Sequence, residues 1–308
     1  MSNTLIGLGD VFNDLINLHN SNRLPNKLLL SGTQGIGKGL LSKHLLNYIL
    51  SKNEPYEYDL KKFQINPSNK SYKLFESNAH PNVFKIYKKK DKKNIDIGQI
   101  REMVKFQNSS SFNNKTRFVL IEDADLLNVN SINALLKSLE EPNNNFSFIL
   151  THNSNKTVLE TLKSRCIEFK VNLKNEFVEN IVNSYFSENV YDQISLDFKN
   201  YYHNPVFLIN LSNYFNENNL DIQNFSIEDL LYEITINPSH LKDEFILLNL
   251  NLFIELYFYK NINAHKKNIF KAKEYFLKKL SNVKKYNLDI ETFFLEFKDL
   301  LKWVKISI

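Results

Sequence analysis

Apolar residues in the first half of the chain occur in short, nearly unbroken runs that end at a glycine, an acidic residue or a polar turn. Such runs are the pattern of strands buried on both faces of a sheet. Between them, apolar residues recur every three or four positions, which indicates amphipathic helices. We therefore predict strands at 27–31, 83–87, 117–121, 146–151 and 167–171, with residues 51–94 otherwise irregular.

Helices are predicted between these strands. One follows Lys38, a second begins near Asp96, and a third precedes the strand at 146–151. The third places four apolar residues on one face, namely Ile132, Leu135, Leu136 and Leu139. Strands that alternate with helices predict a parallel sheet covered by helices on both faces. We therefore expect an α/β domain over residues 1–171.

The pattern changes after residue 172. From 175 to 308 the apolar residues, many of them aromatic, keep helical spacing throughout, which predicts an all-helical half. Its most apolar stretch, 245–259, is shorter than the roughly 20 residues that span a bilayer, so we interpret it as a buried helix. We divide this half into a small helical domain at 172–215 and an all-α domain at 216–308, with the boundary in the polar stretch 216–224.

Composition and charge add less. Cys166 is the single cysteine, which excludes a disulfide framework and a multi-cysteine zinc site and favours a reducing cytoplasm. The first residues show no signal-peptide pattern, so we expect a cytoplasmic protein without a membrane segment. The net charge is +5, and the local basic run at 88–93 is interpreted either as a solvated loop or as a salt-dependent contact with nucleic acid.

A phosphate-loop motif follows the first predicted strand. Residues 32–39, Gly-Thr-Gln-Gly-Ile-Gly-Lys-Gly, match G-x-x-x-x-G-K-[ST] except at the last position. The glycines let backbone N–H groups converge on phosphate oxygens, and the lysine adds a cation. At the last position glycine lacks the hydroxyl that ligates Mg²⁺. We predict a phosphate-loop fold without competent ATP hydrolysis and leave ATP binding open; the candidate nucleotide-binding residues are Gly32, Gly35, Gly37, Lys38 and Gly39.

Glu122 and Asp123 end the strand at 117–121, where an ATPase of this class has Asp followed by Glu. In the reversed order, the shorter side chain stands where the longer one should reach the attacking water. A carboxylate displaced by about 1.5 Å can cost orders of magnitude in rate, because this chemistry depends on positioning. Two interpretations stay open: a residual metal or capping role, or acids that only end a strand.

Ser164-Arg165-Cys166 precedes the last predicted strand. An arginine at such a place can act as an arginine finger, which stabilises charge on a phosphate transferred in an adjacent subunit and is worth about 10³–10⁵ in rate. The alternative is a surface arginine that flanks the strand.

Together these motifs resemble the delta-prime subunits of bacterial DNA polymerase III clamp loaders, within the AAA+ superfamily. The resemblance covers residues 1–172; the C-terminal half is similar only in length and helical character. The positions that carry it are Leu24-Pro25, Gly35-Ile36-Gly37-Lys38, His80-Pro81, Ile100-Arg101, Asp123-Ala124-Asp125-Leu126-Leu127-Asn128, Asn133-Ala134-Leu135-Leu136-Lys137, Leu139-Glu140-Glu141-Pro142 and Ser164-Arg165-Cys166.

The resemblance implies an AAA+ P-loop domain, a helical lid and a helical collar that joins a five-subunit ring with motor and delta subunits. In that family this subunit is a stator that does not hydrolyse ATP but supports ATP-driven loading of the sliding clamp onto primed DNA. The clamp and primer–template DNA are then indirect partners. Arg165 takes the role of an arginine finger in trans, and Thr151 or Asn153 falls at the sensor-1 position.

Two departures from the family pattern matter. Many relatives carry a four-cysteine zinc module after the first helix, but residues 51–94 contain no cysteine, so we predict no zinc, no other metal and no required cofactor. The helix start at 203–206 lacks the sensor-2 arginine of active relatives. The alternative function is an active AAA+ motor subunit of the same complex, which predicts tight ATP binding by the isolated chain and suits Ser or Thr at position 39 better.

Overall fold

The computed structural model describes residues 3–89, 92, 94–109, 115–140, 145–156, 160–201, 204–261 and 268–306. The chain divides into two compact units, Met1–Ile181 and Val182–Ile308. Within the described ranges, no helix combines the length and apolar character needed to cross a membrane. The predicted split of the second half into two helical domains stays a prediction.

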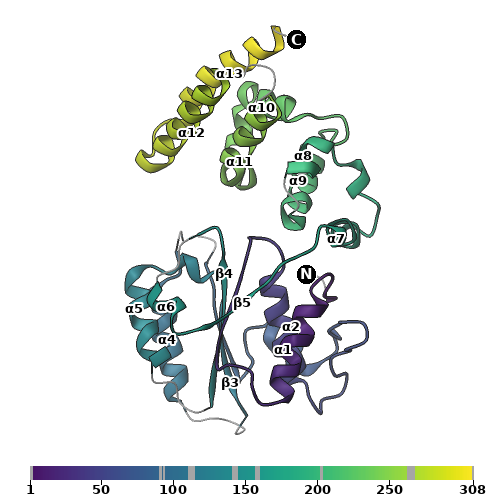
Figure 1. Cartoon of the computed structure of the whole chain (residues 1–308), viewed down its shortest axis with the longest axis vertical. Helices are drawn as coiled ribbons and strands as arrows, with labels where there is room; N and C mark the ends of the chain where they lie inside the picture. The colour runs from purple at the N-terminus through teal and green to yellow at the C-terminus, as the bar shows by residue number, and fades with distance from the viewer. Residues whose placement is uncertain are drawn as a thin grey trace. The chain divides into compact units, whose positions relative to one another are not determined.

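The first unit is built on a five-stranded parallel sheet (Figure 1). All neighbouring strands pair in parallel. In sheet order the strands are β2 (Val83–Ile86), β3 (Arg117–Ile121), β4 (Phe146–Asn153), β1 (Lys27–Gly32) and β5 (Ile167–Lys170). All five predicted strands are therefore confirmed. β4 continues two residues beyond the predicted end, to Asn153, and so brings the candidate sensor residues into the sheet.

Helices cover both faces of this sheet, as predicted. In Figure 1, α1 (Gly9–Asn20) and α2 (Lys38–Leu50) lie on one side, and α4 (Ile97–Asn108), α5 (Val129–Glu140) and α6 (Glu160–Lys163) on the other. Successive side chains of a strand point to opposite faces. In β1, accordingly, Leu28 and Leu30 belong to the core under α1 and α2, whereas Leu29 belongs to the core under α4 and α5. Both faces are apolar, which explains the unbroken apolar runs in the sequence.

A short helix within the stretch 51–94 was missed. α3 (Lys70–Glu76) lies within the stretch that we expected to be irregular apart from a strand. The Asn69 side chain caps it by accepting a hydrogen bond from the Tyr72 N–H at 2.7 Å. The Ser71 N–H and hydroxyl both donate to the Glu54 carboxylate, at 3.0 and 2.7 Å. A seven-residue helix is too short to form alone and depends on such contacts from elsewhere in the chain, which periodicity does not reveal.

The second unit is helical, as predicted, and α7 (Glu176–Phe186) crosses the boundary between the units. The further α-helices in the described part of this unit are α8 (Leu196–Tyr201), α9 (Pro205–Glu217), α10 (Ile227–Ile236), α11 (Glu244–Lys260), α12 (Asn268–Tyr286) and α13 (Ile290–Ile306). The stretch at 245–259 lies within α11, where Phe253, Tyr257 and Phe258 are buried. Rings of α13 contact rings of α11 and of α12 edge to face, so an aromatic core holds these three helices together.

Candidate functional site

The phosphate-loop motif forms the turn between β1 and α2. Gly35 and Gly37 have φ angles of 80° and 98°, in the left-handed region that favours glycine. Gly37 is the N-cap of α2, so the helix begins at Lys38 with the N–H groups of its first turn free of intrahelical partners. This backbone arrangement suits a phosphate group, because convergent N–H groups and a helix N-terminus attract anions.

The phosphate loop itself supplies hydrogen-bond acceptors for the Lys38 ammonium group. Its side chain is almost fully buried, and Nζ donates hydrogen bonds to the carbonyl oxygens of Gly32 at 2.9 Å and Thr33 at 2.6 Å. Burial lowers the pKa of this ammonium, and the nearby carboxylates of Asp123 and Asp125 act in the opposite direction. A phosphate that recruits Lys38 must therefore replace two existing hydrogen bonds.

The position of the missing hydroxyl faces Glu122. A Cβ atom built at Gly39 would meet Glu122 Oε1 at 4.0 Å. Burial raises the pKa of the Glu122 carboxyl group, an effect that Lys85 partly offsets. Metal ligation needs an ionised carboxylate and, in this motif, a hydroxyl. The residues present therefore fit a phosphate group but not a phosphate with its magnesium ion.

Asp123 and Thr151 connect the acidic pair to the adjacent strand. Asp123 is exposed and has a φ angle of 53°, and its N–H donates to Thr151 Oγ1 at 2.9 Å. Thr151 is buried in β4. One candidate sensor residue thus holds the turn that follows β3, and β4 separates β3 from β1, the strand that leads into the phosphate loop.

Asn153, the second candidate sensor residue, lies beside the phosphate loop. Its Nδ2 is 3.5 Å from Oε1 of Gln34 in the loop, and its N–H donates to Asp125 Oδ1 at 3.0 Å. Lys156 pairs with the other Asp125 oxygen at 3.0 Å, and the Asp125 side chain is only 1% exposed. Burial acts to raise the pKa of Asp125, but these hydrogen bonds hold it below its ordinary value.

Sequence reasoning did not assign a role to Asp125 or Lys156. Asp125 entered only as part of a family motif, and Lys156 follows β4 without any motif. The signal available in the sequence was that polar residues stand at the ends of two strands. Parallel strands end at the same edge of the sheet, so such residues lie close together. The partner of the buried carboxylate could be identified only in three dimensions.

Arg165 lies apart from this cluster. Nη1 donates to the carbonyl oxygen of Thr161 at 2.9 Å, and Nη2 forms an ion pair with Oε1 of Glu140. The Arg165 side chain is 33% exposed. Residues 141–144 and 203 lie outside the described residues, so Glu141, Pro142 and His203 are not placed.

The sheet register shows that Arg165 and the phosphate loop lie toward opposite ends of the strands. Ile167, two residues after Arg165, pairs with Leu28 near the start of β1, whereas the loop follows Gly32 at the end of β1. A strand rises about 3.3 Å per residue, so the two ends of β1 are separated by about 17 Å. Arg165 is therefore poorly placed to reach a phosphate held by its own loop.

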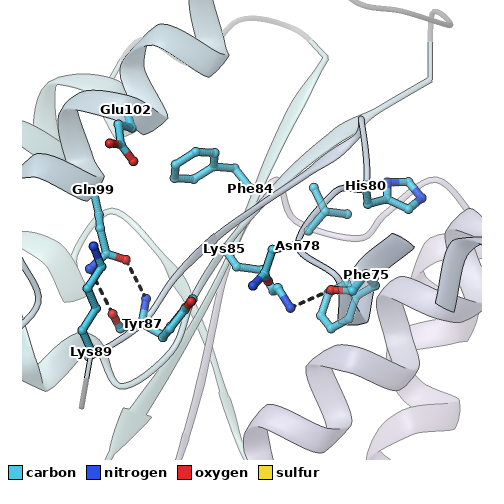
Figure 2. A pocket seen from close by; sticks show the side chains of 10 residues that line it. Phe75, Asn78, His80, Phe84, Lys85, Tyr87, Lys89, Gln99 and Glu102 are labelled. Carbon is cyan, nitrogen blue, oxygen red and sulfur yellow. Dashed lines mark hydrogen bonds between the residues drawn. The ribbon is translucent and has the colours of Figure 1, made fainter. Parts of the chain in front are cut away.

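A cavity of about 270 Å³ lies elsewhere, at the edge strand β2 (Figure 2). The Gln99 side chain pairs with the backbone of Tyr87 just after this strand. It accepts a hydrogen bond from the Tyr87 N–H at 3.2 Å and donates one to the Tyr87 carbonyl oxygen at 3.0 Å. Lys85 Nζ donates to the Phe75 carbonyl at 2.7 Å. None of the candidate site residues lines this cavity.

The family comparison agrees with the motifs. Residues 8–175, more than half of the chain, match the family model described as DNA polymerase III, delta subunit. Over 140 residues the chain is 32% identical to DNA polymerase III subunit delta' of Pseudomonas aeruginosa. This match covers 46% of this chain and 41% of the relative.

Two further curated relatives are more distant. Subunit delta' of Escherichia coli is 26% identical over 155 residues, covering 50% of this chain and 45% of the relative. Subunit gamma of Buchnera aphidicola is 26% identical over 172 residues, covering 56% of this chain and 45% of the relative. In each case the match spans less than half of the relative.

Among solved structures, a DNA polymerase III gamma subunit-related protein from Thermotoga maritima is similar over nearly the whole chain. The match covers 93% of this chain and 98% of the Thermotoga maritima chain, with a TM-score of 0.54 and 17% sequence identity. At that identity the likeness shows the fold, and it extends into the helical half, where the sequence motifs stop.

Proposed function

The chain belongs to the DNA polymerase III, delta subunit family, and on that premise we propose that it is the delta-prime, or stator, subunit of a clamp loader. In this role it supports ATP-driven loading of a sliding clamp onto primed DNA by contributing Arg165 to the ATP site of a neighbouring subunit. The observation that carries this proposal is the separation of Arg165, toward one end of the strands, from the chain's own phosphate loop at the other.

The chain's own loop supports a role without hydrolysis. Lys38 is engaged by two loop carbonyls, Gly39 offers no hydroxyl, and the half-buried Glu122 has a raised pKa. Phosphoryl transfer depends on placing a metal ion, a water and three phosphate oxygens together. A loop that lacks a metal ligand can retain its backbone shape and still provide little catalysis. We propose that no cofactor and no zinc ion are required for the fold.

The proposed partners follow from this role. They are the motor and delta subunits of a five-subunit ring in the cytoplasm, with the clamp and primer–template DNA contacted through the assembled complex. The curated relatives are named as subunits of DNA polymerase III, and the match spans less than half of each of them.

Replacing Arg165 tests the proposal directly. In a reconstituted clamp loader, Arg165→Ala should leave assembly intact and strongly lower DNA-stimulated ATP turnover, since an arginine finger is worth about 10³–10⁵ in rate at its site. Lys163→Ala is the matched control, because Lys163 is a more exposed cation two residues away that pairs with Glu168. A normal rate in the Arg165→Ala complex would show that the trans role is wrong.

The isolated chain separates this proposal from the alternative of an active motor subunit. We expect no appreciable ATPase activity from the purified chain. Clear Mg²⁺-dependent turnover that Lys38→Ala abolishes would instead establish a motor function.

A further inference from the structure

Glu140 is the last residue of α5. Its carboxylate forms an ion pair with Arg165, 25 residues further along the chain. The Glu140 side chain is 50% exposed. An ion pair between side chains this exposed contributes little to stability, because water screens it and two flexible side chains must be ordered. Its role is therefore better sought in the orientation of the arginine.

The two anchors of Arg165 act on different nitrogen atoms. Glu140 holds Nη2, and the carbonyl oxygen of Thr161 holds Nη1 at 2.9 Å. Two contacts at separate corners of a planar group fix both its place and its plane. Among the described residues, no hydrogen-bond partner is found for Nε, and each Nη carries a second proton. The guanidinium thus keeps donors for an anion from outside the chain.

We propose that Glu140 is a positioning residue that holds the Arg165 guanidinium in the orientation needed to meet a phosphate of the neighbouring subunit. This inference rests on the proposed trans role of Arg165. Without the carboxylate, one anchor remains, and the side chain can rotate about its several single bonds. A misplacement of about 1 Å in a group that acts by position can lower a rate by about 100-fold.

The first test uses the reconstituted clamp loader. Glu140→Ala should lower kcat for DNA-stimulated ATP hydrolysis by about 10- to 100-fold and leave KM for ATP nearly unchanged, because positioning acts in the transition state. Glu140→Gln keeps the length and the acceptor oxygen, so its kcat should fall between those of wild type and Glu140→Ala. Glu168→Ala is the matched control, since it removes the carboxylate from the adjacent Lys163–Glu168 pair of 3.0 Å.

The double variant shows whether Glu140 acts through Arg165. If it does, Glu140→Ala added to Arg165→Ala causes no further loss, since residues that act as a unit are not additive. Full additivity of the two losses would overturn the positioning role. So would a normal kcat in Glu140→Ala when Arg165→Ala is defective. If Arg165→Ala is itself normal, the proposed function fails and this inference falls with it.

A second measurement needs no partner. In the isolated full-length chain, the ¹⁵N signals of the Arg165 guanidinium report how strongly that group is ordered. We expect Glu140→Ala to increase the mobility of this group and Glu168→Ala to leave it as in wild type, while both variants keep the wild-type fold by circular dichroism. Unchanged Arg165 order in Glu140→Ala would overturn the inference independently of any ATPase assay.

Discussion

A Cβ atom at Gly39 would point at Glu122, meeting Oε1 at 4.0 Å, which is ordinary van der Waals contact. The backbone at Gly39 also lies outside the left-handed region that disfavours other residues. The phosphate loop therefore has room for the side chain that active loops carry at this position. What position 39 lacks is the chemistry of a metal ligand, and not space.

Gly39→Thr should consequently create a magnesium-dependent gain in nucleotide affinity. The new hydroxyl would lie in the first turn of α2, beside Glu122, and supply the missing ligand. We expect ATP to bind about tenfold more tightly with Mg²⁺ than without it, a difference of about 1.4 kcal/mol, as measured with a fluorescent nucleotide. Gly39→Ala is the control, since it adds a Cβ without a hydroxyl. Equal behaviour of the two variants would contradict the explanation.

The sheet was predictable because its signal is local. Each strand is buried on both faces, so Leu28, Leu29 and Leu30 are apolar irrespective of the face they occupy. The phosphate loop was predictable for a similar reason, since Gly35 and Gly37 adopt conformations that favour glycine. Both features depend on residues that are adjacent in sequence.

The remaining features depend on contacts between distant residues. α3 relies on Ser71 and Glu54, whose contacts no periodicity shows. The Glu140–Arg165 pair joins the end of one helix to the residue before a strand. The separation of Arg165 from the loop required the register of β1 and β5. Sequence motifs named the candidate residues, and only the structure showed which of them lie together.

His44 should make stability depend on pH. It is fully buried, its Nδ1 is 2.7 Å from the Tyr58 hydroxyl, and burial, aided by Lys43, lowers its pKa to about 3. In the unfolded chain the pKa is about 6.5. At pH values below about 6.5, His44 is protonated in the unfolded state and stays neutral in the folded state. Stability therefore falls as the pH drops from about 6.5 toward 3.

The expected loss from this histidine alone is about 2 kcal/mol at pH 5. Urea denaturation of wild type and His44→Gln at pH 7, 6 and 5 measures it. The glutamine does not titrate, so the difference between the two free energies of unfolding should shift in favour of the variant as the pH falls. A difference that stays constant with pH would exclude this role for His44.

Arg117 should resist even a conservative replacement. Its side chain is almost fully buried at the start of β3, with the guanidinium over the rings of Phe106 at 4.8 Å and Phe146 at 4.2 Å. Its two terminal nitrogens donate to Phe106 O, Gln107 O, Ser109 O and Ser109 Oγ. A lysine ammonium cannot match this planar fork, so Arg117→Lys should lower the free energy of unfolding by about 2–4 kcal/mol.

Arg23→Lys is the control for this change, because Arg23 is exposed. It should alter the free energy of unfolding by less than about 0.5 kcal/mol. Both variants can be compared in the same urea titration. If Arg117→Lys is as mild as Arg23→Lys, the hydrogen bonds around Arg117 contribute less than their geometry implies.

Two buried tyrosines should respond differently to loss of the hydroxyl group. Tyr257 is fully buried in α11, and among the described residues its hydroxyl has no hydrogen-bond partner. The Tyr58 hydroxyl, in contrast, is bonded to His44. A buried hydroxyl without a partner costs about 1–3 kcal/mol in desolvation, whereas a bonded one contributes about 1 kcal/mol.

Tyr257→Phe should therefore leave the free energy of unfolding unchanged or raise it by about 1 kcal/mol, and Tyr58→Phe should lower it by about 1–2 kcal/mol. Thermal and urea denaturation of both variants at pH 7 check this, and a clear loss in Tyr257→Phe would reveal a partner for its hydroxyl.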